Sequence, residues 1–140
     1  MHLRYVNEYR RVGLETGVSA ASPHKMVEML YDGAIRYVRE AQRHMAGHDV
    51  AAKGEAISRV IAIVEQGLSG TLDRARGGTL AERLSALYDY MCRRLLMANL
   101  NNDSAALDEV ATLLAELRDA WQQINPDNAA PPVSLKVVTA

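Results

Sequence analysis

The sequence predicts an all-α protein, an antiparallel up-down-up-down four-helix bundle preceded by a short N-terminal helix or hook. Apolar residues recur every three or four positions in separate long stretches, which is the spacing of one face of an α-helix. The breaks between the stretches are only two or three residues long, so consecutive helices are expected to run antiparallel. The chain is 49% hydrophobic but contains no Phe, so we expect a core of Leu, Ile, Val, Met and Ala.

Residues 1–18 are expected to form an N-terminal capping segment outside the bundle. They carry scattered apolar residues around Tyr9, and Gly13 and Gly17 follow and favour a flexible connection. The bundle itself is expected over residues 19–125.

The first long helix is predicted over residues 22–46. Ser22 can accept a hydrogen bond from the free amides at the helix start, and Pro23 at the first helical position loses no hydrogen bond. An apolar stripe with helical spacing follows and ends before Gly47.

The second and third helices are predicted to meet at a pair of glycines. The second helix begins after Asp49, a capping residue, and its apolar spacing continues to Gly77 and Gly78, which are expected to end it. The third helix is predicted to begin at Thr79, because Thr79 and Glu82 have the spacing of a capping box.

The fourth helix is predicted to begin after Asp103, which can cap it, and to end before Asn125 and Pro126, which break the helical pattern. Residues 126–140 show no helical period. They are expected to form a flexible tail.

Charge and composition exclude several classes of partner. Sixteen Lys and Arg against seventeen Asp and Glu give a net charge of −1, so neither nucleic acid nor an anionic membrane surface is expected to bind. The single Cys92 excludes an internal disulfide, and no apolar stretch has the length of a signal peptide core or a membrane span. We therefore expect a cytoplasmic protein with a protein partner and no membrane insertion.

No motif indicates an enzyme, a cofactor or a metal site. Di-iron bundles need Glu-x-x-His on two helices, and the chain has none. His44 and His48 have the spacing of a shared zinc site, but Gly47 lies between them and no third ligand is near. His48 also precedes Lys53 by the wrong spacing for a histidine phosphotransfer domain.

The helical stretches carry more apolar residues than one core stripe uses. Deep packing or a homodimer face would explain this, and so would a groove for a partner helix, because exposed apolar patches often mark binding sites. Met side chains would suit such a groove, since they adapt to varied surfaces. The extra residues are Tyr31, Ile35, Val60, Ile63, Tyr88, Leu96, Met97 and Leu100, and the Met residues are Met26, Met29, Met45, Met91 and Met97.

Short motifs along the chain occur in the order and spacing of a known family. From about residue 5 to residue 125, the chain resembles the FliS family of flagellin export chaperones. The motifs are Ala-Ser-Pro at 21–23, MLYDGA at 29–34, GG-x-LA at 77–81, LYDYM at 87–91, Arg-Leu at 94–95, Ala-Asn at 98–99 and LRDAW at 117–121.

The resemblance implies a cytoplasmic chaperone for flagellar type III secretion. Such a protein binds the C-terminal segment of flagellin in an apolar groove, prevents premature polymerisation and keeps flagellin competent for export during flagellum biogenesis. No cofactor is implied. Other flagellar regulatory or export proteins are further candidate partners, and a monomer or a weak homodimer is expected.

The resemblance also implies which residues bind the partner. Tyr9 matches a family Tyr in the segment expected to lie over the groove in the free state. Tyr31 and Tyr88 are the strongest groove candidates, since a phenol hydroxyl usually stays near water or a polar partner; Leu87, Met91 and Leu95 are equally expected in the core. The full set is Tyr9, Met26, Tyr31, Ile35, Ile57, Val60, Ile61, Val64, Leu84, Leu87, Tyr88, Met91, Leu95 and Asn99.

Overall fold

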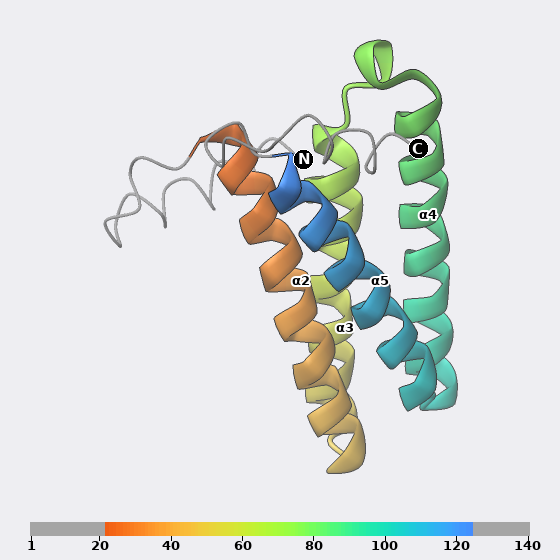
Figure 1. Cartoon of the computed structure of the whole chain (residues 1–140). Helices are drawn as coiled ribbons and strands as arrows, with labels where there is room; N and C mark the ends of the chain where they lie inside the picture. Colours follow the sequence, from red (N-terminus) through yellow and green to blue (C-terminus); the bar gives the residue numbers. More distant parts are fainter. Residues whose placement is uncertain (1–21, 125–140) are drawn as a thin grey trace.

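The computed structural model describes residues 22–124 of the chain, which form a helical bundle (Figure 1). This part of the chain contains no strand, so the predicted all-α bundle is confirmed. None of its helices is long and apolar enough to cross a membrane. The helices are α2 (Pro23–Ala46), α3 (Val50–Ala62), α4 (Arg74–Asn101) and α5 (Ser104–Gln123).

Helices α2 and α5 run antiparallel along their whole length. Residues further along α2 contact residues nearer the start of α5. Figure 1 shows that the chain also reverses direction between α2 and α3, between α3 and α4, and between α4 and α5. The contacts pair His24 with Trp121, Asp32 with Arg118, Arg39 with Asp108, and Gln42 with Ser104.

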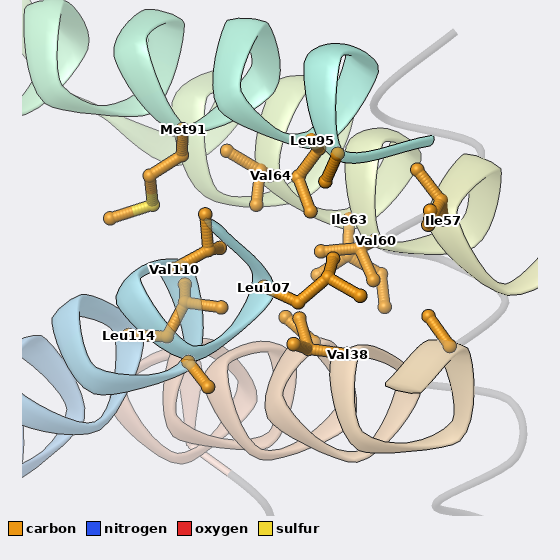
Figure 2. Close-up of a cluster of buried hydrophobic side chains, with 14 of the residues drawn as sticks. Val38, Ile57, Val60, Ile63, Val64, Met91, Leu95, Leu107, Val110 and Leu114 are labelled. Atoms are coloured by element: carbon orange, nitrogen blue, oxygen red, sulfur yellow. The ribbon is translucent and has the colours of Figure 1, made fainter. Parts of the chain in front are cut away.

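The core is built from aliphatic side chains and Met, as the absence of Phe predicts. Figure 2 shows these side chains converging from all the helices. Each fully buried Leu or Ile contributes about 1.5–3 kcal/mol relative to an exposed one, so this cluster is the main source of stability. Its largest members include Val38, Ile57, Val60, Ile63, Val64, Met91, Leu95, Leu107, Val110 and Leu114, all at most 1% exposed.

The predicted starts of the first, second and fourth helices are confirmed. Ser22, Asp49 and Asp103 each accept a hydrogen bond, 3.1 Å long, from the backbone amide three residues later. Each side chain thereby satisfies one of the amides that a helix start leaves free.

The predicted end of the second helix is wrong. The α-helical pattern of α3 stops at Ala62, and the chain continues as a π-helix over Ile63–Leu68 and a 3₁₀ turn over Ser69–Thr71. Leu72 is extended, with φ −67° and ψ 128°, so the helix has ended before the glycine pair is reached.

The third helix begins earlier than predicted, with a short first turn that Asp73 caps, although its regular part begins at Thr79 as expected. The Asp73 carboxylate accepts a hydrogen bond from the backbone amide of Arg76 at 3.1 Å. Gly78, with φ 52° and ψ −128°, then interrupts α4, and regular helix resumes at Thr79. The glycine pair therefore makes a kink within α4 instead of ending the helix before it.

Lys53 fastens the end of α4 to α3. It is only 4% exposed, and its ammonium donates to the backbone carbonyl of Asn99 at 2.9 Å and to the side-chain oxygen of Asn102 at 2.6 Å. A cation is favourable there because the last carbonyls of a helix carry partial negative charge.

Gly78→Ala is expected to lower the free energy of unfolding by about 1–3 kcal/mol, because the backbone conformation at this position strongly disfavours a side chain. Urea denaturation followed by circular dichroism measures the change. Gly54→Ala is the matched control: an added Cβ there would lie 3.9 Å from the Asn99 side-chain nitrogen, at ordinary van der Waals distance. The control should raise stability by about 0.5–1 kcal/mol, since Ala suits a helix interior better than Gly. Equal effects at the two positions would contradict the assigned role of the kink.

Candidate functional site

An apolar pocket of about 340 Å³ opens at the end of the bundle where α2 begins and α5 ends. We call it the terminal pocket. Its walls come from α2, the end of the π-helix, the first half of α4 and the end of α5, and Asp73, Arg76, Thr71 and Gly77 also border it. Its apolar lining consists of Val27, Leu68, Leu72, Leu80, Ala81, Leu84 and Trp121.

The terminal pocket is open to solvent along α4. Leu80 is 55% exposed although it lines the pocket, and Leu84, one turn further on, is only partly buried. The extended residue Leu72 and the kink at Gly78 flank this stretch, so the chain there departs from regular bundle packing. An accessible apolar surface of this kind is typical of a partner site.

The indole of Trp121 is held firmly as one wall of the pocket. It stacks on the His24 ring, with centroids 4.3 Å apart and planes 10° apart. The indole N–H donates to the His24 carbonyl at 2.8 Å, and His24 Nε2 donates to the Trp121 carbonyl, also at 2.8 Å. These reciprocal contacts fix the start of α2 against the end of α5.

Glu28 reinforces the same end of the bundle. Its buried carboxylate accepts hydrogen bonds from the Gln122 amide at 2.9 Å and from the Lys25 ammonium at 3.1 Å. The hydrogen bond from Gln122 is the main reason that the pKa of Glu28 lies below its usual value. The group is therefore a charged link between α2 and α5.

Tyr31 and Tyr88 meet where the terminal pocket borders the core. Their hydroxyl oxygens lie 2.6 Å apart, and the residues are 3% and 2% exposed. Burial raises the pKa of both phenols, so both keep their protons at neutral pH.

The structure brings only some of the predicted partner-binding residues to the terminal pocket, namely Tyr31, Leu84 and Tyr88. Asn99 is half-buried beside Lys53. Tyr9, the capping segment 1–18 and the tail 126–140 lie outside the described residues. Of the remaining residues, Met26, Ile57, Val60, Val64, Met91 and Leu95 are buried, as Figure 2 shows for all but Met26, and Ile35, Ile61 and Leu87 pack against the core while partly exposed.

Sequence reasoning missed much of the pocket lining. The helical spacing includes Leu72, Leu80 and Trp121 but does not distinguish them from core residues, and only the neighbouring Gly77 and Gly78 indicate a break nearby. The expected Met-rich lining is not found either, because no Met is among the described residues that line the pocket.

The expectation of extra apolar surface is confirmed for three of the predicted residues of α4, but not for Tyr88, which is 2% exposed, or for Tyr31 of α2, which is 3% exposed. Leu96, Met97 and Leu100 are 58%, 47% and 76% exposed. It is wrong for the second helix, because Val60 and Ile63 are completely buried and belong to the core. Leu96, Met97 and Leu100 are not among the residues that line the terminal pocket.

Neither a metal-binding cluster nor an activated thiol is found within residues 22–124. No three His, Cys, Asp or Glu side chains in this range are grouped so that they could hold a metal ion. Burial raises the pKa of the Cys92 thiol to about 11, so the thiol stays protonated and weakly nucleophilic at neutral pH.

Comparisons with known proteins agree with this picture of a binding protein. A family model described as flagellar protein FliS matches residues 5–128. The chain is 48% identical over 121 residues to the flagellar secretion chaperone FliS of Salmonella typhimurium, covering 86% of this chain and 90% of that protein. It is 40% identical over 115 residues to the FliS of Escherichia coli, covering 82% and 85% of the two chains. With the flagellar secretion chaperone FliSB of Pseudomonas aeruginosa it shares 37% identity over 123 residues, covering 88% of this chain and 97% of that one. The chain therefore belongs to the FliS family of flagellar secretion chaperones.

Proposed function

We propose that this protein is a cytoplasmic export chaperone whose terminal pocket binds the C-terminal segment of flagellin. The observation that carries the proposal is an apolar pocket, open to solvent, in a chain of the FliS family. Bound in this way, flagellin is kept from polymerising prematurely and stays competent for export. Tyr31, Leu84 and Tyr88, which line the pocket, are the predicted binding residues that contact the client, while the predicted residues buried away from the pocket hold the bundle in shape.

The proposed mechanism is holding without turnover. The client segment is disordered when free and folds into a helix as it binds, so burial of apolar area must exceed the cost of ordering the chain. The pocket volume is at the lower end of the range of about 300–1,000 Å³ for ligand sites, so it accepts anchoring side chains of a helix rather than the helix itself.

The first test is a calorimetric titration with the C-terminal segment of flagellin from the same source. We expect one-to-one binding with a large negative change in heat capacity, because a disordered segment folds as it buries apolar surface. Trp121 is the only tryptophan of the chain and lines the pocket, so its fluorescence should change with the same titration curve. No binding at all would exclude this client.

Leu80→Glu is expected to weaken binding of the flagellin segment at least about tenfold, which is about 1.4 kcal/mol, because it puts a charge on the apolar wall of the pocket. The matched control is Val50→Glu. Val50 is 71% exposed and starts α3, at the other end of the bundle, so both variants should fold normally. Equal affinities for the two variants would place the binding surface elsewhere.

We further propose that residues 1–18, which include Tyr9, cover the terminal pocket in the free protein. The segment precedes Ser22, at the start of the helix that carries Val27 of the pocket. A chaperone lacking residues 1–18 should bind the flagellin segment several-fold more tightly, because a competitor within the same chain reduces the population that can bind. Removal of residues 126–140 is the control and should leave the affinity unchanged. An unchanged affinity after removal of residues 1–18 would show that the segment does not compete.

A further inference from the structure

The hydroxyl pair of Tyr31 and Tyr88 lies at the buried inner boundary of the terminal pocket, whereas Thr71, Asp73 and Arg76, the other polar residues that border the pocket, are exposed. Tyr31 comes from α2 and Tyr88 from α4, and the pocket lies between these helices. The two oxygens are 2.6 Å apart, a normal length for a hydrogen bond between hydroxyls. The pair therefore joins the two helices, and both of its residues border the space that a client would fill.

The two phenols carry one hydroxyl proton more than their mutual hydrogen bond uses. Each phenol carries one proton and can also accept hydrogen bonds, and burial keeps both phenols protonated. One proton makes the hydrogen bond between the two oxygens. Within residues 22–124 neither hydroxyl has another hydrogen-bond partner, so the second proton has no acceptor from this part of the protein.

The surroundings make this proton significant. A donor left without an acceptor in a water-poor site costs free energy, whereas one that meets an acceptor is favourable. The neighbouring walls are apolar side chains, including Val27, Leu84 and Trp121. An occupant of the pocket that displaces water must therefore provide the acceptor itself.

We propose that the Tyr31–Tyr88 pair is a specificity device that selects a client helix presenting one neutral side-chain oxygen, from Asn, Gln, Ser or Thr, among its apolar anchors. The proposal rests on the proposed function, because it names the chemistry of the segment that the terminal pocket binds. A fully apolar segment leaves the second hydroxyl proton without an acceptor and binds less well. A carboxylate is disfavoured because the walls beside the pair are apolar, and because Arg76, the basic residue that borders the pocket, is exposed to solvent and paired with Asp73.

The test compares the wild-type chaperone with the double variant Tyr31→Phe/Tyr88→Phe in titrations against the C-terminal segment of flagellin. Phe retains the ring and removes only the hydroxyl, so the binding constant should fall about threefold to tenfold through loss of one hydrogen bond. Tyr90→Phe is the matched control. The Tyr90 hydroxyl donates to Glu109 and Tyr90 does not line the pocket, so this variant should bind like the wild type.

A second arm changes the client and leaves the chaperone intact, so its outcome does not depend on how the Phe variants fold. Each Asn, Gln, Ser and Thr of the flagellin segment is replaced by Ala in turn. One replacement should weaken binding to the wild type and have much less effect on the double Phe variant, which identifies the residue that meets the hydroxyl pair.

The outcomes separate the two proposals. If the wild type binds the segment and the double Phe variant binds equally well, the specificity device is overturned and the proposed function stands. If the wild type does not bind the segment at all, the proposed function itself fails. Weakening by the double Phe variant, coupled to one client residue and absent for Tyr90→Phe, establishes the device.

Discussion

The contact between Tyr31 and Tyr88 marks the point where the core of the bundle ends and the terminal pocket begins. Along one face of α4, Leu95 and Met91 are completely buried, Tyr88 is 2% exposed, Leu84 is partly exposed and Leu80 is 55% exposed. The core and the terminal pocket therefore share one apolar stripe of α4. The stripe stabilises the fold at one end, and at the other end Leu84 and Leu80 leave it accessible to solvent.

This continuity explains how much of the site could be predicted from the sequence. Periodicity identifies the stripe but is the same for its buried and its accessible parts, so Met91 and Leu84 appear equivalent. The exposure of each residue depends instead on where the other helices of the bundle stop covering the stripe, and this is decided by tertiary packing. The family motifs include Tyr31, Tyr88 and Trp121, but they predict neither the hydrogen bond between the two phenols nor the place of Trp121 in the same pocket.

The fold was predictable where local chemistry determines it and unpredictable where it does not. Helix starts at Ser22 and Asp103 can be predicted because these side chains cap the helix themselves, and the structure has helix starts at both positions. The π-helix over Ile63–Leu68 keeps a helical appearance in sequence, and Gly78 allows a kink as readily as an end. The burial of Lys53 could not be predicted either, because its partners, the Asn99 carbonyl and the Asn102 side chain, are distant in sequence.

The arrangement also suits a chaperone that must later release its client. Apolar walls give affinity in proportion to the area they bury, but they discriminate poorly between segments of similar hydrophobicity. A buried donor contributes little net affinity, yet it penalises any occupant that lacks an acceptor, because the penalty is the full cost of an unsatisfied group. In the proposed mechanism, one hydroxyl pair among apolar walls would therefore add selectivity without making the complex too tight to dissociate, as holding a client for export requires.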